Sequence, residues 1–229
     1  MPVNQIRVAS WNLRRGRADL DLLQAQNPAL VLAQEVTAAA FADLRRRFEW
    51  GVYSLELRGD CVREMSPNKH GVAVAGSSQL APRRCYLVEH FVAPWKMPAV
   101  DLALTHHRGY FTALSYHAFY GQCGQDGFDK PRLTLQVADW LEHQPQPVVL
   151  GMDANSPVVD HPDPAKAEWS FPWLGPGSFD RRLLGPNPRH RLRDTLRQSG
   201  SAHSAHLLTQ VPASHRLALD SRRANRSTG

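Results

Sequence analysis

Short segments that alternate between apolar and polar residues predict a chain in which strands and helices take turns. Residues 6–13 alternate in this way, which is typical of a half-buried strand, and this strand would end near Asn12. Leucines at helical spacing then predict a short helix over residues 18–26. The apolar run at residues 30–33 predicts a buried strand, and its end would present the carboxylate of Glu35.

The middle of the chain continues the same pattern. Thr37 is a residue type that caps helices, and it precedes an amphipathic stretch. Residues 50–57 and 71–75 are strand-like. Residues 101–107 and 110–117 alternate on either side of an Arg-Gly pair, which predicts a β-hairpin.

The last third begins with a regular pattern and then loses it. Lys130-Pro131 predicts the start of a helix, and residues 147–150 predict another buried strand. Prolines and glycines crowd residues 157–188, which indicates a long surface loop. Residues 189–198 predict one more helix, whereas residues 199–229 are polar and show no convincing strand.

Polar side chains follow the predicted strands where the strands end. Asn12 and Glu35 stand at two such ends, and Asp153 and Asn155 follow a third strand, two residues apart. Carboxylate and amide oxygens without cysteine are the ligands that suit Mg²⁺ or Mn²⁺. Loops at strand ends can reach a ligand without disturbing the core. The sequence therefore predicts a metal site at one edge of the sheet.

Four motifs occur in an order that resembles the endonuclease/exonuclease/phosphatase superfamily. They are Ser10-Trp11-Asn12-Leu13, Gln34-Glu35, Ser115-Tyr116-His117 and Gly151-Met152-Asp153-Ala154-Asn155. The resemblance spans about residues 6 to 200. It implies an α/β fold built as a four-layer α/β/β/α sandwich, in which two mixed β-sheets pack face to face with helices outside.

The resemblance also implies a role for each motif residue. Glu35 would bind a magnesium ion, with Mn²⁺ as the alternative, and Asn12 would stand beside it in the metal and phosphate site. Asp153 would orient or deprotonate the attacking water, and Asn155 would hydrogen-bond the phosphate. A histidine would help neutralise charge on the phosphoryl oxygens, and His117 fits that place.

Further residues are candidates for substrate contacts. His106 and its neighbour His107 also end a predicted strand and compete with His117 for the histidine role. Lys69 and its neighbour His70 lie in the loop before residues 71–75 and could reach a phosphate. His161 lies just beyond the Asp-x-Asn segment and could contact substrate, although ordering a proline-rich loop explains it equally well.

Composition narrows the class of protein. Hydrophobic residues make up 42% and charged residues 21% of the 229, which is ordinary for a globular protein and argues against a disordered chain. No apolar run approaches a membrane span and no signal peptide is evident, so we expect a cytoplasmic protein without a membrane partner. Three scattered cysteines indicate neither a disulfide framework nor a zinc cluster. The net charge of +6 favours an anionic partner such as nucleic acid.

One part of the superfamily pattern is absent from the sequence. Relatives carry a late strand with an aspartate and then a Ser-Asp-His motif, whereas the nearest string here is Ser214-His215-Arg216. We therefore expect a domain over residues 1–200 that lacks its C-terminal strands, followed by a polar, poorly ordered tail over residues 201–229.

The resemblance leaves more than one function open. The first is metal-dependent hydrolysis of phosphate esters by a nuclease or phosphodiesterase. The alternatives are an inactive remnant that binds nucleic acid or a phosphorylated ligand, and a small-molecule or lipid phosphatase of the same fold.

Overall fold

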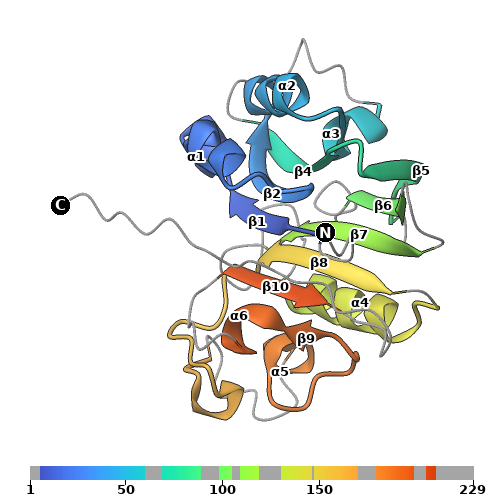
Figure 1. The fold of residues 1–229 in the computed structure, drawn as a ribbon. Coiled ribbons are helices and arrows are strands. Elements are labelled where there is room, and N and C mark those ends of the chain that lie inside the picture. Colours follow the sequence, from blue (N-terminus) through green and yellow to red (C-terminus); the bar gives the residue numbers. More distant parts are fainter. Residues whose placement is uncertain are drawn as a thin grey trace.

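Two β-sheets and the helices that cover them make up the described part of the chain. The computed structural model describes residues 6–59, 69–88, 98–104, 109–118, 130–145, 147–169, 179–198 and 205–209. Figure 1 shows α1 and α2 on the outer face of the first sheet, and α4 and α5 on the outer face of the second sheet. None of the helices in these residues combines the length and the apolar character that a membrane span requires.

The first sheet has four strands in the order β1-β2-β4-β3. They are β1 (Val8–Asn12), β2 (Leu30–Thr37), β4 (His70–Gly76) and β3 (Trp50–Tyr53). The helical segments of this half are η1 (Arg14–Gly16), α1 (Leu20–Ala25), α2 (Ala38–Arg47) and α3 (Ser54–Leu57). Strands β1 and β2 are parallel, so their carboxyl ends lie at the same edge of the sheet.

The second sheet has six strands in the order β5-β6-β7-β8-β10-β9. They are β5 (Leu80–Leu87), β6 (Pro98–Leu104), β7 (Tyr110–His117), β8 (Val148–Asp153), β10 (Ala205–Thr209) and β9 (Arg193–Asp194). Its helical segments are α4 (Lys130–Glu142), η4 (Pro164–Lys166), α5 (Phe179–Leu184) and α6 (Thr195–Gln198). Strands β7 and β8 are parallel, and α4 connects them.

Three hydrophobic cores separate these layers. The core between the sheets joins residues of β1, β2 and β4 to Phe111, Ala113 and Val149 of the second sheet. A second core lies between the first sheet and the helices α1 and α2, and a third lies between the second sheet and the helices α4 and α5. Burial of each large apolar side chain contributes about 1.5–3 kcal/mol. The arrangement is the predicted four-layer α/β/β/α sandwich.

The two sheets approach closely at Gly151 of β8. A Cβ atom at this position would lie 2.5 Å from Leu32 Cβ and 2.9 Å from Ser10 Oγ, and real Cβ atoms do not come so near. The glycine therefore lets β8 approach β1 and β2 just below the strand ends, where the polar residues lie.

Most predicted elements are present, and local chemistry explains them. Thr37 caps α2 by accepting a hydrogen bond from the amide of Ala40, as predicted. The predicted hairpin strands pair antiparallel as β6 and β7, while residues 105–108 between them lie outside the described residues. The strand predicted over residues 50–57 is correct only for its first half, because Ser54–Leu57 forms the helix α3.

Three strands of the second sheet, β5, β10 and β9, have no counterpart in the predicted pattern. Strand β5 is mostly exposed along its middle, and its prolyl and arginyl residues hide the alternation that marks a half-buried strand. Strand β10 lies at residues 205–209, where the polar pattern predicted no strand, and it pairs with both β8 and β9. The helix predicted over residues 189–198 is shorter, because β9 precedes α6.

Candidate metal and phosphate site

The alternation of side chains along the strands brings three of the predicted site residues into the space between the sheets. In β1, Val8 faces the core between the sheets, so Asn12, an even number of residues later, lies on the same face. In the second sheet, Ala113 and Val149 also face the core between the sheets. His117 follows Ala113 by four residues and Asp153 follows Val149 by four, so both lie on the same face of their strands as these core residues. His117 and Asp153 are opposite each other where β7 pairs with β8. All three therefore point between the sheets where their strands end.

Glu35 reaches the same space by a different route. Regular alternation would turn this residue toward the helices, as it turns Val31 and Ala33. The pairing of β2 with β4 shifts between Ala33 and Val36, which places one extra residue in β2 and forms a β-bulge. Glu35 lies in the bulge with a φ of 51°, in the left-handed region that non-glycine residues seldom adopt. This conformation brings the carboxylate to the site.

A single amide group joins the two carboxylates. Asn12 Nδ2 lies 2.6 Å from Asp153 Oδ2 and 3.1 Å from Glu35 Oε1, and it donates to both. Asn12 Oδ1, the atom that could ligate a metal, accepts instead from the backbone amide of Arg14 at 2.8 Å. Two negative charges therefore lie close together around a neutral side chain.

The imidazole of His117 completes the cluster. Its Nε2 lies 3.7 Å from Glu35 Oε1, and its side chain is nearly buried. One possible ligand atom each from Glu35, His117 and Asp153 lie within 4.8 Å of one another, so these three residues could hold a metal ion. Two carboxylates at this separation fit a divalent cation such as Mg²⁺ or Mn²⁺.

Asn155 organises the turn that follows β8. Its φ is 47°, its backbone amide donates to Asp153 Oδ1 at 3.1 Å, and its Nδ2 donates to the carbonyl oxygen of Ala118 at 3.0 Å. The carbonyl oxygen of Asn155 in turn accepts from Lys130 Nζ at 2.6 Å. The buried lysine at the start of α4 thus supports the loop that carries the predicted phosphate-binding amide.

A buried polar link lies beneath the site. Gln34, which is 0% exposed, donates from Nε2 to the Leu32 carbonyl oxygen at 2.9 Å and to Ser115 Oγ at 3.2 Å, across the gap between the sheets. Ser115 Oγ donates to the Ala33 carbonyl oxygen at 2.9 Å. These contacts tie the strand before Glu35 to the strand before His117.

Sequence reasoning assigned no site role to Arg15 or Lys130, and it named His70 only as a neighbour of Lys69 that could reach a phosphate. Arg15 Nε is 3.9 Å from Glu35 Oε2. The ring of His70, at the start of β4, has its centroid 6.0 Å from that of His117. The basic run that follows Asn12 was the available signal for Arg15, whereas the places of Lys130 and Gln34 depend on contacts between distant segments.

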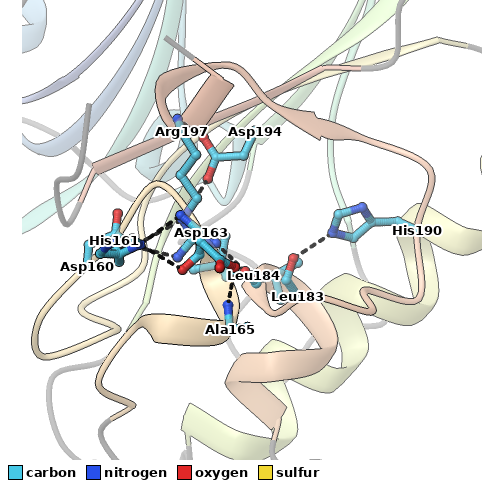
Figure 2. Close-up of polar contacts among 9 residues, drawn as sticks. All are labelled: Asp160, His161, Asp163, Ala165, Leu183, Leu184, His190, Asp194 and Arg197. Carbon is cyan, nitrogen blue, oxygen red and sulfur yellow. Dashed lines mark hydrogen bonds and ion pairs between the residues drawn. The ribbon is translucent and has the colours of Figure 1, made fainter. Parts of the chain in front are cut away.

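Of the predicted substrate-contacting residues, the structure describes Lys69 and His161. Lys69 is exposed and immediately precedes His70 in the chain. His106 lies outside the described residues. His161 lies in the loop after β8, where its Nδ1 accepts from the amide of Asp163 at 2.9 Å, as Figure 2 shows. Within the described contacts His161 therefore orders its own loop.

The loop after β8 is held by a second charged cluster, which sequence reasoning did not identify. Arg197 of α6 donates to Asp160 Oδ1 from Nη2 at 2.5 Å and from Nε at 3.0 Å (Figure 2). The guanidinium also lies 3.6 Å from Asp194 Oδ2 and 5.9 Å from the ring centre of Trp169, and Nη1 donates to the carbonyl oxygen of Leu184. Its side chain is only 5% exposed.

His190 lies in the same region. Its Nε2 lies 2.8 Å from the carbonyl oxygen of Leu183 (Figure 2). Its Nδ1 accepts from the amide of Leu192 at 3.2 Å. Burial lowers the pKa of His190, and the Leu183 carbonyl oxygen partly offsets this effect. The neutral imidazole is therefore the form that fits the fold.

Comparison with known proteins identifies the fold. No family model and no curated protein matches the sequence. Among solved structures, the catalytic domain of human nocturnin with a bound sulfate anion is 16% identical, with a TM-score of 0.53 over 90% of this chain and 82% of that chain. An endonuclease/exonuclease/phosphatase family protein from Bacteroides thetaiotaomicron is 13% identical, with a TM-score of 0.56 over 91% and 84%. TDP2 of D. rerio complexed with a single strand DNA product is 11% identical, with a TM-score of 0.54 over 91% and 85%.

These similarities confirm the resemblance that the motifs indicated, at the level of the fold. The chain has the four-layer sandwich of the endonuclease/exonuclease/phosphatase superfamily. Its cluster of polar residues lies between the sheets at the carboxyl ends of β1, β7 and β8 and in the bulge of β2.

Proposed function

We propose that this protein hydrolyses phosphate esters with a divalent metal ion, Mg²⁺ or Mn²⁺, and that its substrate is nucleic acid. The observation that carries the proposal is the pair of carboxylates, Glu35 and Asp153, which come from different sheets and share the amide of Asn12. Like charges at this separation repel each other, and a bound cation removes that cost. The pair is therefore suited to binding a cation from solution.

The metal would be held by Glu35 and Asp153. When bound, a divalent ion supplies positive charge that stabilises the negative charge developing on the phosphate. Asn12 was predicted to ligate the metal, but its Oδ1 accepts from the Arg14 amide, so its geometry favours holding the two carboxylates in place. Amide orientation follows from the hydrogen bonds, and here both hydrogen bonds from Nδ2 reach carboxylates.

The attacking water would be oriented by Asp153, whose Oδ2 faces the shared space between the sheets. A carboxylate there can accept the proton of a water as it attacks the phosphorus atom in line. Oδ1 of the same carboxylate accepts from the Asn155 backbone, which fixes the direction in which Oδ2 points. Direct attack by water requires no covalent enzyme intermediate.

The phosphate would be contacted by Asn155 and His117. The Asn155 amide has a second N–H besides the one donated to Ala118, and this N–H can bind a phosphoryl oxygen. His117 can donate to another oxygen of the phosphate when it is protonated, which neutralises charge in the transition state. Lys69, His106 and His161 remain proposed substrate contacts.

Nucleic acid is the substrate that several independent features favour. The net charge of +6 suits a polyanion, because lysine and arginine gain by releasing counterions from phosphates. A solved structure of the same fold, TDP2 of D. rerio, is complexed with a single strand DNA product. A bound sulfate anion in human nocturnin supports an oxyanion site in this fold.

Magnesium-dependent nicking of supercoiled plasmid by the purified chain tests the proposal. We expect nicking by the wild type, loss of nicking in Asp153→Asn, and full nicking in Asp139→Asn, which removes an exposed carboxylate of α4 as a matched control. Circular dichroism establishes that all three are folded. A folded wild type that binds plasmid without nicking it would instead support a nucleic-acid-binding protein without hydrolase activity.

A further inference from the structure

The turn that follows Asn12 has an unusual backbone. Arg14, Arg15 and Gly16 have φ angles of 48°, 58° and 84°, so three successive residues adopt the left-handed conformation. That conformation costs a residue with a side chain about 1–2 kcal/mol, and glycine or asparagine would avoid much of the cost. Hydrogen bonds hold the turn in place, because the Arg14 amide donates to Asn12 Oδ1 and the Gly16 amide donates to the Leu13 carbonyl oxygen.

This backbone directs Arg15 toward the carboxylate site. Its Nε lies 3.9 Å from Glu35 Oε2, while Glu35 Oε1 faces Asn12 and His117 on the other side. The Arg15 side chain is 56% exposed, whereas that of Glu35 is 24% exposed. The guanidinium therefore lies at the solvent side of the carboxylates, at a distance from Glu35 that exceeds a hydrogen bond.

Arg15 also lines a cavity beside the site. The cavity has a volume of about 460 Å³ and lies between the turn, α1 and α2, with Gly16, Thr37, Ala40 and Arg47 in its wall. This volume falls within the range of small-ligand sites. Arg15 thus belongs both to the carboxylate cluster and to an adjacent space large enough for an organic group.

The aspartates in the cavity wall have partners of their own. Asp19 caps α1 by accepting from the amides of Asp21 and Leu22. Asp21 pairs with Arg47, and Asp43 pairs with Arg46. An anion beside Arg15 would therefore meet carboxylates that are already engaged by hydrogen bonds or cations.

We propose that Arg15 is a substrate-binding residue, whose guanidinium holds a phosphate oxygen of a nucleotide while the attached nucleoside lies in the cavity between the turn and α2. The inference rests on the proposed function, because it places the reacting phosphate at Glu35 and Asp153. Arginine binds phosphate through a planar fork of N–H donors, which lysine cannot reproduce. This role explains why an arginine stands at a position where glycine or asparagine would be less strained.

Calorimetric titration with thymidine 5′-monophosphate, with and without Mn²⁺, tests the inference. The variant is Arg15→Asn, because asparagine tolerates the left-handed conformation and so preserves the turn. Arg17→Asn is the matched control, since it removes the same charge from an exposed arginine of the same turn whose φ is −90°. Arg15→Lys keeps the positive charge but removes the planar set of N–H donors, so it separates the effect of the guanidinium geometry from that of the charge.

We expect Arg15→Asn to weaken thymidine monophosphate binding by about 10-fold or more, the loss of one charge-assisted hydrogen bond. Arg15→Lys should fall between this variant and the wild type, and Arg17→Asn should change the affinity less than about 2-fold. Mn²⁺ alone should bind Arg15→Asn at least as tightly as the wild type, because a cation next to Glu35 has been removed.

Three results would overturn the inference. The first is a nucleotide affinity in Arg15→Asn that equals that of Arg17→Asn. The second is a joint loss of Mn²⁺ and nucleotide binding in Arg15→Asn, which would mean that Arg15 positions Glu35. The third is a folded wild type that binds Mn²⁺ but no thymidine monophosphate. Failure of the proposed function has a different signature, namely a wild type that binds no Mn²⁺ although its nucleotide binding still depends on Arg15.

Discussion

The carboxylates at the strand ends and the carboxylates of the Arg197 region are each held close together, but by different partners. Glu35 and Asp153 share the neutral amide of Asn12, whose Nδ2 lies 3.1 and 2.6 Å from them. Asp160 and Asp194 share a cation, because the Arg197 guanidinium lies 2.5 Å from the first and 3.6 Å from the second (Figure 2).

Burial explains why the partners differ. The side chains of Arg197 and Asp160 are 5% and 4% exposed, and carboxylates so far from water require a counter-charge within the chain. Glu35 is 24% exposed, so water can solvate it until a cation arrives. The cation beside this pair, Arg15, is 56% exposed and lies 3.9 Å from Glu35, which exceeds a hydrogen bond. The carboxylate pair is therefore still suited to an exchangeable cation, which is the physical basis of the proposed metal site.

Removal of the built-in cation should have the largest effect. We expect Arg197→Met to lower the free energy of unfolding by about 3–5 kcal/mol, because two carboxylates would stay buried without their partner. Urea denaturation measures this change. The matched control, Arg46→Met, breaks the exposed pair with Asp43 and should cost less than about 1 kcal/mol. Equal effects of the two substitutions would contradict the comparison.

Addition of metal should stabilise the fold through the strand-end carboxylates. At a Mg²⁺ concentration of about 100 times the Kd, mass action raises the free energy of unfolding by about 2.7 kcal/mol. We expect Glu35→Gln to lose this gain and Glu142→Gln, an exposed glutamate at the end of α4, to keep it. Thermal unfolding with and without Mg²⁺ distinguishes the variants, and an equal gain in Glu35→Gln would place the metal elsewhere.

A cation introduced by mutation should give the strand-end carboxylates a permanent positive partner, as Arg197 gives Asp160 and Asp194. In Asn12→Lys the ammonium group can pair with Glu35 and Asp153, so we expect the stability without metal to be retained and the gain from Mg²⁺ to disappear. Asn12→Leu, which removes the amide but adds no charge, should lower the free energy of unfolding by about 1–3 kcal/mol. If Mg²⁺ stabilised Asn12→Lys as much as the wild type, the lysine would not occupy the place of the metal and the prediction would be wrong.

The smallest expected effect is a pH dependence in the Arg197 region. Burial lowers the pKa of His190 below its ordinary value of 6.5, so the unfolded chain binds a proton there that the folded chain resists. His190 therefore contributes stability above pH 6.5, and this contribution is lost as the pH falls below that value. We expect stability to decrease less between pH 7.5 and pH 5 in His190→Gln than in the wild type, as urea denaturation at each pH can measure.

Local patterns predicted many of the individual strands and helices, whereas the four-layer sandwich was expected only from the resemblance to the superfamily. The capping role of Thr37 depends on neighbouring residues alone, so the sequence displays it directly. Strand β5 escaped prediction because its middle residues are exposed and do not alternate. Strand β10 escaped because its place between β8 and β9 depends on pairing with distant strands.

The site was predictable as a set of residues, but its geometry was not. Asn12 and Asp153 stand at the ends of recognisable strands, and their parity brings them between the sheets. Glu35 requires a bulge and a left-handed φ, which no local pattern indicated. The pairing of Arg197 with Asp160 joins residues 37 positions apart, and only the fold brings them together.

Direct titration of the folded chain with Mn²⁺ tests the central claim, that Glu35 and Asp153 form a divalent cation site. We predict one equivalent of bound Mn²⁺ in the wild type and in Asp139→Asn, and a large loss of affinity in both Glu35→Gln and Asp153→Asn. Mn²⁺ binding that is equally tight in the double variant Glu35→Gln/Asp153→Asn, or no binding to the folded wild type, would contradict the claim.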